Sequence, residues 1–394
     1  MKDKLDEIRS RLDSIDKTII DALAERQKAV QQVFSLKAEN SGRLRDYQRE
    51  EQILSEIGDI ARKAGLDRYF AEQIFREIIN HSVRTQTHAL MDYHNPSRSD
   101  KTIRVAYQGT EGAFSHVATQ HHFGDRYADI TSYGYDTFQE AGEAVENGDV
   151  DVAILPIENT TAGSINETYD LLGSSSLVIV GEEVLRIRHC LLALEPVPIE
   201  RIRRIISHPQ ALAQCSRFLS KLTHCHVESY LDTALAARKV QEDGDLSLAA
   251  IAGAQAAEQY GLHIIERDIA NQDLNFTRFV IVAPEPVYCD PQIPCKTSLV
   301  MATSHEKGAL IDCLRVLGDH GINMTKLESR PRPNVPWQYL FYLDIEGNTQ
   351  DENVEEALNE LKKEASFVKI LGCYPIQPNS DEVAKKTGNK GIKE

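Results

Sequence analysis

Apolar residues recur at every third or fourth position from residue 3 to about residue 90, a spacing that predicts helices and no strand. From Ile103 the pattern changes to short apolar runs, among them IRVAY, DVAILPI and FVIVAP, separated by helical stretches. This alternation is typical of α/β units on a largely parallel sheet. After the proline-rich stretch APEPVYCDPQIPCK, the runs spell βαββαβ, a ferredoxin-like α+β unit.

These changes of pattern divide the chain into three expected domains. We place the domains at residues 1–92, 101–284 and 297–378. The polar segment NPSRSD, residues 95–100, is the expected linker after the helices. The tail from Asn379 is expected to be disordered, because it has too little apolar surface to bury.

The charge balance narrows the possible partners. The chain has 44 Lys and Arg against 60 Asp and Glu, a formal net charge of -16, and no basic block interrupts it. We therefore expect neither nucleic acid nor an anionic membrane as a partner. The first residues, MKDKLDEIRS, have no uninterrupted apolar core, so we expect no signal peptide, no membrane span and a cytoplasmic location.

The seven cysteines are scattered, odd in number and never spaced as C-x-x-C, which suits a reducing compartment. His224, Cys225 and His226 are candidate metal ligands, but adjacent residues on a strand point to opposite faces and do not easily converge. The chain also lacks the glycine-rich motifs of nucleotide and dinucleotide sites. We expect no metal and no cofactor.

The apolar seam of the first predicted helix carries charged residues as well. Arg26 and Lys37 continue the seam of Leu5, Ile8, Leu12, Ile15, Ile19, Val30 and Val33, and they lie within about 20° of each other around the helix. In the second helix the seam reaches Asp46 and Glu50, and in the third it reaches Ser82 and Gln86. Unpaired burial of such groups costs several kcal/mol. Either a small anionic ligand inside the bundle or an internal network such as Lys37 with Glu50 would satisfy them.

A second chain is expected to complete the helical segment. Arg9 lies about 25 Å along the helix from Arg26, too far to share one small ligand within the same chain. Three helices, one of them very long, also lack the sequence to cover their own seam. The natural solution is a homodimer with shared helices.

Polar residues follow several predicted strands of the α/β segment. They lie in QGTEGAFSH, PIENTT, ISHPQALAQ and NFTRF, and the candidates are Ser115, Glu158, Asn159, Thr160, Ser207, His208, Gln210, Gln214, Asn275, Thr277 and Arg278. Ligands of open α/β sheets collect beyond the carboxyl ends of strands, so we expect one cleft. Ordinary helix N-capping is the alternative, and it explains Ser115 well. It does not explain three polar residues in succession at 158–160.

From about Leu5 to Pro375 the chain resembles the bacterial bifunctional chorismate mutase/prephenate dehydratase family. The resemblance implies a multidomain fold class: an all-α chorismate mutase-type helical dimer domain, an α/β two-lobed dehydratase domain like a type 2 periplasmic binding protein, and an α+β ferredoxin-like ACT domain. In the helical domain it implies arginines that hold the two carboxylates of chorismate, with Lys37 and Gln86 at the ether oxygen. The matching positions are Arg9 from one protomer with Arg26, Lys37, Asp46, Arg49, Glu50, Ser82 and Gln86 from the other.

For the α/β segment the resemblance implies a prephenate site. Thr277 would assist departure of the ring hydroxyl, Ser115, Asn159 and Gln214 would bind prephenate, and Arg278 is a candidate for a substrate carboxylate. Glu158, Thr160 and His208 are further candidates at the substrate, and Glu158 or His208 is the alternative to Thr277 as proton donor.

For the C-terminal unit, the motifs GALIDCL and ESRP resemble a phenylalanine effector site. The residues implied are Gly308, Ala309, Leu310, Glu328, Ser329, Arg330 and Pro331. A plain dimerisation sheet is the alternative reading of the same pattern.

The leading hypothesis is an enzyme of phenylalanine biosynthesis. It converts chorismate to prephenate and prephenate to phenylpyruvate, and L-phenylalanine inhibits it. One alternative is a ligand sensor without chemistry, and another is a dehydratase whose helical segment serves only as a dimerisation arm.

Overall fold

The computed structural model describes residues 2–39, 44–96, 102–124, 126–332, 335 and 337–377, without the side chains of residues 2, 3 and 35–39. Most of the expected linker, residues 97–100, and the tail from Asn379 lie outside these ranges. The chain forms two compact units. One comprises Met1–His94 with Asp290–Pro294, and the other comprises Asn95–Cys289 with Cys295–Glu394.

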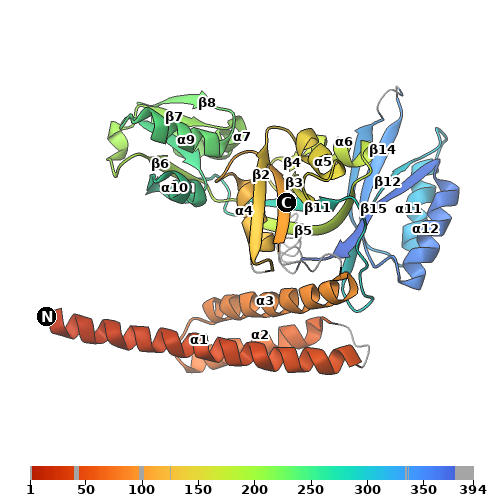
Figure 1. Ribbon diagram of the computed structural model, residues 1–394, viewed down its shortest axis with the longest axis horizontal. Coiled ribbons are helices and arrows are strands. Elements are labelled where there is room, and N and C mark those ends of the chain that lie inside the picture. The colour runs from red at the N-terminus through yellow and green to blue at the C-terminus, as the bar shows by residue number, and fades with distance from the viewer. Residues whose placement is uncertain are drawn as a thin grey trace, which may run out of the picture. The chain divides into compact units, whose positions relative to one another are not determined.

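The first unit is helical, as its spacing predicts (Figure 1). Its helices are α1 (Lys2–Glu39), α2 (Tyr47–Lys63) and α3 (Arg68–His94). Helices α2 and α3 bury Leu54, Ala61, Ile79 and Leu90. By contrast, the apolar seam of α1 lies open within one chain, with Leu5, Ile8, Leu12, Ile15, Ile19 and Val33 between 46% and 57% exposed.

The first lobe of the second unit is a sheet of order β2-β1-β3-β11-β5, with β4 paired to β3. Its strands are β1 (Thr102–Gln108), β2 (Asp129–Tyr135), β3 (Val152–Asn159), β4 (Gly163–Ser164), β5 (Val178–Arg186) and β11 (Phe276–Ala283). The helices of this lobe are α4 (Phe114–Phe123), α5 (Phe138–Glu146) and α6 (Asn166–Ser174). Strand β1 runs parallel to β2 and β3, whereas β11 runs antiparallel to both of its neighbours.

The second lobe is a sheet of order β10-β6-β9-β7-β8. Its strands are β6 (Cys190–Ala193), β7 (Arg204–Ser207), β8 (His226–Ser229), β9 (Leu248–Ala252) and β10 (His263–Glu266). Its helices are α7 (Pro209–Gln214), α8 (Ser216–Leu219), α9 (Thr233–Asp243), α10 (Ala254–Tyr260) and the short 3-10 helix η2 (Ile199–Arg201). The chain crosses from the first lobe to the second at residues 187–189 and returns at residues 267–275 into β11. Figure 1 shows the sheets of the two lobes as separate. The expectation of largely parallel sheets is therefore corrected: both are mixed, because the returning strand β11 and strands β6 and β10 are antiparallel.

The last part of the second unit has the predicted βαββαβ order. Its elements are β12 (Cys295–Ala302), α11 (Ala309–Asp319), β13 (Met324–Pro331), β14 (Tyr339–Glu346), α12 (Glu352–Glu364) and β15 (Phe367–Pro375). The antiparallel sheet has the order β13-β14-β12-β15, and α11 and α12 pack with it around Cys313, Val316 and Leu361.

This C-terminal sheet shares a core with the first lobe. Val300, Tyr342 and Leu371 belong to the same buried cluster as Leu177 and Ile179. The contact is close enough that a Cβ on Gly372 would collide with the backbone carbonyl of Ile179. The glycine is thus required by the approach of β15 to β5.

A buried ion-pair network also joins the two sheets. Glu182 on β5 is fully buried and pairs with Arg278 on β11 at 2.8 Å and with Lys296 on β12 at 2.7 Å. Arg278 extends to Asp344 on β14 at 2.5 Å and donates to the Tyr374 hydroxyl at 2.8 Å. Two carboxylates thus face two cations, which is what permits charges to be buried here.

The network fixes the charge state of its acids. Burial by itself would raise the pKa of Glu182, but the charges of Lys296 and Arg278 outweigh it, and the pKa is lowered. The same balance lowers the pKa of Asp344, where burial opposes the charges of Arg278 and Lys296. Both side chains are therefore carboxylates at neutral pH.

Within the described residues, none of the helices combines the length and the apolarity that a membrane crossing requires.

We expect Glu182→Gln to lower the free energy of unfolding at neutral pH by about 3–5 kcal/mol, because it leaves buried cations without their partner. Glu182 has a lowered pKa when folded, so its contribution is complete above its unfolded value of about 4 and is lost as pH falls through the folded value. The difference between variant and wild type should therefore shrink toward low pH. Urea unfolding followed by circular dichroism at several pH values measures it.

The matched control is Glu258→Gln, which changes an exposed glutamate on α10 and should leave the urea midpoint unchanged at every pH. A Glu182→Gln midpoint equal to that of wild type at neutral pH would show that the network gives no net stability.

Candidate functional site

Two polar clusters emerge, one in each compact unit. In the helical unit, Arg26 of α1 donates to the Ser82 hydroxyl of α3 at 2.9 Å. One turn further along α3, Gln86 donates to the backbone carbonyl of Val30 at 3.4 Å. The structure therefore brings Arg26 from the seam of α1 together with Ser82 and Gln86 from the seam of α3.

Arg26 is a half-buried cation with no carboxylate partner in the part of the chain that the structure describes. Burial lowers its pKa, a sign that its charge is only partly compensated. Ser82 is buried and accepts from Arg26 while donating to the carbonyl of Ile78. This arrangement favours an anion as the missing partner of Arg26.

The other residues predicted for the helical site have different partners from one another. Glu50 forms a two-armed ion pair with Arg45, at 3.0 and 3.1 Å, and sequence reasoning missed Arg45. Asp46 caps α2 by accepting from the backbone N–H of Arg49, whose side chain is exposed. The expected pair of Lys37 with Glu50 lies outside the description, since nothing is described of the Lys37 side chain.

Arg9 stays apart from this cluster. Its side chain is 66% exposed, and its one ion pair among the described residues is a 3.5 Å contact with Asp6 on the same helix. Because α1 is continuous from Lys2 to Glu39, Arg9 and Arg26 are about 25 Å apart along one axis. One chain alone does not unite them.

The second cluster lies where the two lobes of the α/β unit meet. Asn159, at the end of β3, donates to the Thr277 hydroxyl at 3.0 Å and to the Asn275 side chain at 2.8 Å. Gln214, from α7 of the other lobe, accepts from Asn275 at 3.1 Å and donates to Thr161 at 2.6 Å. Three of the four strand-end stretches thus contribute Asn159, Gln214, Asn275 and Thr277 to one hydrogen-bonded group, and QGTEGAFSH contributes none of its members.

Sequence reasoning missed one histidine of this cluster. His189 lies in the first crossing between the lobes, and its Nε2 is 2.8 Å from the side-chain oxygen of Gln214. The ring is 2% exposed, and burial lowers its pKa, so it is neutral at neutral pH. Its Nδ1 is buried without a hydrogen-bond partner among the described residues.

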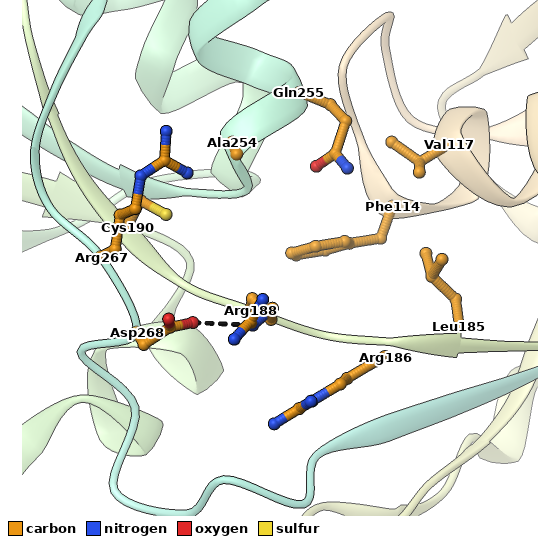
Figure 2. Close-up of a pocket in the computed structure, with 10 residues that line it drawn as sticks. All are labelled: Phe114, Val117, Leu185, Arg186, Arg188, Cys190, Ala254, Gln255, Arg267 and Asp268. Atoms are coloured by element: carbon orange, nitrogen blue, oxygen red, sulfur yellow. Dashed lines mark ion pairs between the residues drawn. The ribbon is translucent and has the colours of Figure 1, made fainter. Parts of the chain in front are cut away.

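A cavity of about 200 Å³ lies beside this cluster, between the lobes (Figure 2). Its lining comes from both lobes and comprises Phe114, Val117, Leu185, Arg186, Arg188, Cys190, Ala254, Gln255, Arg267 and Asp268. Leu185 is the direct strand partner of Thr277, and the Phe114 ring lies 5.7 Å from the ring of His189. The cavity and the polar cluster are therefore adjacent.

The cavity is electropositive. Arg188 pairs with Asp268 at 2.8 Å, which leaves the positive charges of Arg186 and Arg267 without a carboxylate among the described residues. A small cavity with an aromatic wall and uncompensated arginines suits an organic anion. In the sequence, the alternating arginines of LRIRH, between two apolar runs, are the signal that would have revealed this electropositive cavity.

The remaining predicted residues of this segment lie elsewhere. Ser115 does not cap α4, because the N-cap is Ala113 and Ser115 is the buried second residue of the helix. Thr160 bonds across to β11, accepting from the Phe276 N–H at 2.9 Å. His208 caps α7 through the N–H of Gln210.

Glu158 and Arg278 lie on the other face of the sheet from Asn159 and Thr277, since neighbouring strand residues alternate in direction. Glu158 pairs at 3.0 Å with Lys326 of β13, in the βαββαβ part of the second unit. Arg278 is occupied by the buried network. We therefore correct the assignment of Arg278 to a substrate carboxylate, because each of its three guanidinium nitrogens already donates within the buried network and the side chain faces away from the cluster.

The predicted effector residues fall on two separate elements. Gly308 has a φ of 91° and is the N-cap residue of α11, followed by Ala309 and Leu310 in the first turn of the helix. The residues Glu328, Ser329, Arg330 and Pro331 lie on β13, an edge strand. Glu328 accepts from Ser164 at 2.5 Å and Arg330 pairs with Asp170 at 2.8 Å, so β13 is tied to the first lobe. Within the described ranges, no hydrogen bond or ion pair joins β13 to residues 308–310.

Comparisons with known proteins identify the families that the two segments match. Residues 8–87 match the family described as chorismate mutase type II, and residues 105–287 match the family described as prephenate dehydratase. A bifunctional chorismate mutase/prephenate dehydratase of Enterobacter agglomerans is 37% identical over 94% of this chain and 95% of its own length.

Two solved structures resemble a large part of this chain. One, described as GqqA, a novel type of quorum quenching acylase, has a TM-score of 0.65 and 33% identity over 70% of this chain and 99% of its own. The other, a prephenate dehydratase from Arthrobacter aurescens in complex with L-Phe, has a TM-score of 0.64 and 26% identity over 73% of this chain and 100% of its own.

Proposed function

Because the chain belongs to the family of bifunctional chorismate mutase/prephenate dehydratases, we propose that it converts chorismate to prephenate in its helical unit and prephenate to phenylpyruvate between its α/β lobes. The observation that carries the proposal is that both family matches contain an anion-suited polar cluster. One surrounds Arg26, and the other surrounds Asn159 and Thr277 beside an arginine-lined cavity.

The helical cluster suits a pericyclic rearrangement. Such a reaction needs no nucleophile, only a folded substrate and cations where the breaking C–O bond gains negative charge. Arg26 supplies a half-buried cation without a carboxylate partner among the described residues, and Gln86 and Ser82 supply polar groups beside it. We assign the ether oxygen to Lys37 and Gln86 and the carboxylates of chorismate to the arginines.

Arg9 serves this site from a second copy of the chain. Within one chain, the rise of the continuous helix α1 places Arg9 about 25 Å from Arg26. The exposed seam of α1 gives a second copy an apolar surface to cover, with Leu5, Ile8 and Leu12 about half exposed. We therefore propose a homodimer, or a higher homo-oligomer built from it, as the active form.

The second cluster suits loss of carbon dioxide and water. When the ring carboxylate leaves as CO2, its bonding electrons enter the ring and expel the hydroxyl, which needs one proton to depart as water. Asn159 donates to the Thr277 oxygen, which leaves the hydroxyl proton of Thr277 free to be donated to the departing group, and Thr277 regains a proton from solvent before the next turnover. Arg186 and Arg267 are the residues that hold the side-chain carboxylate of prephenate in the adjacent cavity.

The C-terminal unit is proposed as an ACT regulatory domain that binds L-phenylalanine. A similar structure of a prephenate dehydratase holds that amino acid, and the unit has the βαββαβ topology of the predicted domain. Residues 308–310 and 328–331 are the proposed contacts. Because Glu328 and Arg330 bond to Ser164 and Asp170 of the first lobe, a ligand at β13 acts on contacts that reach the dehydratase sheet.

The seven cysteines are unpaired, and we propose a reducing location, the cytoplasm.

The first test supplies the purified chain with chorismate alone. We expect chorismate to disappear and phenylpyruvate to appear, with phenylpyruvate formation suppressed by L-phenylalanine. Absorbance at wavelengths specific to each compound follows both steps. A chain that turns over neither chorismate nor added prephenate would instead support the ligand sensor.

The mutase assignment predicts that Lys37→Ala lowers the rate of chorismate loss by about 10²- to 10³-fold, the usual effect of removing one group that stabilises developing negative charge. Dehydration of added prephenate should stay at the wild-type rate. The control is Lys28→Ala, which removes an exposed lysine from the same helix. A wild-type rate of chorismate loss in Lys37→Ala would indicate that the helical unit serves only as a dimerisation arm.

The dehydratase assignment predicts that Thr277→Val lowers kcat for prephenate by about 10²-fold or more, because the hydroxyl is lost while the shape is kept. Chorismate loss should be unaffected. Thr131→Val, which changes an exposed threonine on β2 of the same sheet, is the matched control. If Thr277→Val keeps full activity, the proton comes from another group of the cluster.

A further inference from the structure

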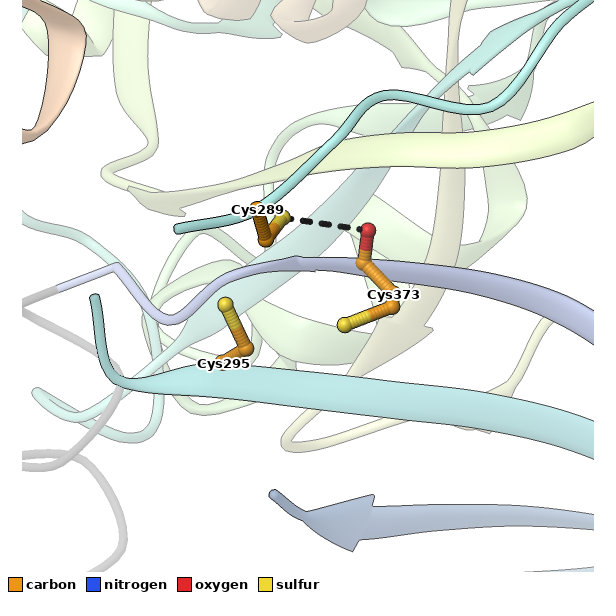
Figure 3. Close-up of side chains that lie close together, drawn as sticks. All are labelled: Cys289, Cys295 and Cys373. Carbon is orange, nitrogen blue, oxygen red and sulfur yellow. Dashed lines mark hydrogen bonds between the residues drawn. The ribbon is translucent and has the colours of Figure 1, made fainter. Parts of the chain in front are cut away.

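Three cysteines that are far apart in sequence meet in the second unit (Figure 3). Cys289 lies in the segment after β11, Cys295 begins β12, and Cys373 lies on β15. Their three sulfur atoms lie within 4.8 Å of one another. Among the described residues, no other group of histidine, cysteine and acidic side chains converges in this way.

Strand pairing explains how two of the sulfurs meet. In the antiparallel pair of β12 and β15, Cys295 lies opposite Pro375 and Cys373 lies opposite Thr297. The two cysteines are thus diagonal neighbours on one face of the sheet. Cys289 reaches the same place from the preceding segment, and its thiol donates to the Cys373 carbonyl at 3.4 Å.

The surroundings bury two of the three cysteines, and Cys373 is partly exposed. Cys289 and Cys295 are each 3% exposed. Asn348 is 2% exposed, and its side chain lies 3.7 Å from the sulfurs of both Cys295 and Cys373. The same amide donates to the carbonyl of Cys289 at 3.1 Å. Asn348 therefore contacts all three cysteines.

The spacing of the sulfurs is close to that of a metal site. A tetrahedral zinc ion with bonds of about 2.3 Å to sulfur holds its thiolates about 3.8 Å apart. Sulfurs already within 4.8 Å need to move by only about 1 Å to reach that spacing. A disulfide would instead bring two sulfurs to about 2 Å and leave the third without a role.

We propose that Cys289, Cys295 and Cys373 bind one thiophilic divalent cation of the zinc class. Three thiolates occupy three positions of a tetrahedron, and the fourth faces the amide of Asn348, which holds a water ligand there. The ion fastens the segment after β11 to the first and last strands of the C-terminal sheet. Binding releases the protons of the thiols that ionise.

The test uses the full-length protein, reduced and freed of metal by a chelator, and titrated with Co²⁺ as a coloured substitute for zinc. We expect thiolate-to-cobalt charge-transfer absorption and the intense visible bands of tetrahedral cobalt, saturating at one ion per chain. Added Zn²⁺ should displace the cobalt and abolish both signals. Thermal unfolding in the presence of Zn²⁺ should then shift to higher temperature, and a chelator should reverse the shift.

Cys295→Ser and Cys373→Ser should each lose the charge-transfer absorption and the thermal shift. The matched control is Cys313→Ser, which changes a fully buried cysteine of the neighbouring core that lies outside the cluster and should bind as wild type. Circular dichroism establishes which variants are folded.

Two results on the wild-type chain would overturn the proposal without recourse to variants. One is the absence of thiolate-to-cobalt absorption in the reduced protein. The other is formation of a disulfide within the cluster on mild oxidation, detected as a loss of two hydrogens by mass spectrometry, in a protein that binds no cobalt. Cobalt absorption that persists in Cys373→Ser would overturn it as well.

Discussion

The ion pairs around Arg278 constrain the rest of the second unit. A guanidinium and an ammonium are buried beside two carboxylates, Glu182 and Asp344, and each charge is tolerated only because the opposite charges are in contact with it. The partners come from β5 and β11 of the first lobe and from β12 and β14 of the C-terminal sheet. A partial separation of the two sheets would therefore leave charges unpaired while they are still buried, which is costly.

Strand β11 transmits this constraint to the polar cluster. Arg278 points into the ion-pair network, and Thr277, one residue earlier, points to the opposite face, where it meets Asn159. A shift of β11 along its neighbours would move both side chains at once. The position of Thr277, the proposed proton donor, is thus set by charges on the opposite face of its own sheet. Strand β13 also contacts this lobe, through Ser164 and Asp170.

The helical unit follows a different rule. Its seam is continuous along α1, yet one chain leaves it about half exposed, and Arg9 and Arg26 remain on distant parts of one helix. A ligand site that needs both arginines requires a second copy. In the proposed mutase site, assembly and catalysis are therefore linked, whereas the polar cluster between the α/β lobes forms within one chain.

Periodicity and spacing in the sequence determined the helices of the first unit, the βαββαβ order of the last, and the group formed by Asn159, Gln214 and Thr277. These features depend on local repeats and strand ends, which neighbouring residues encode. Tertiary structure alone decided the role of Arg278, the antiparallel return of β11, the meeting of Arg267 with Arg186 at the cavity, and the meeting of Cys289 with Cys295 and Cys373. Each depends on which distant strands become neighbours and on which face a side chain lies, and no local pattern carries that information.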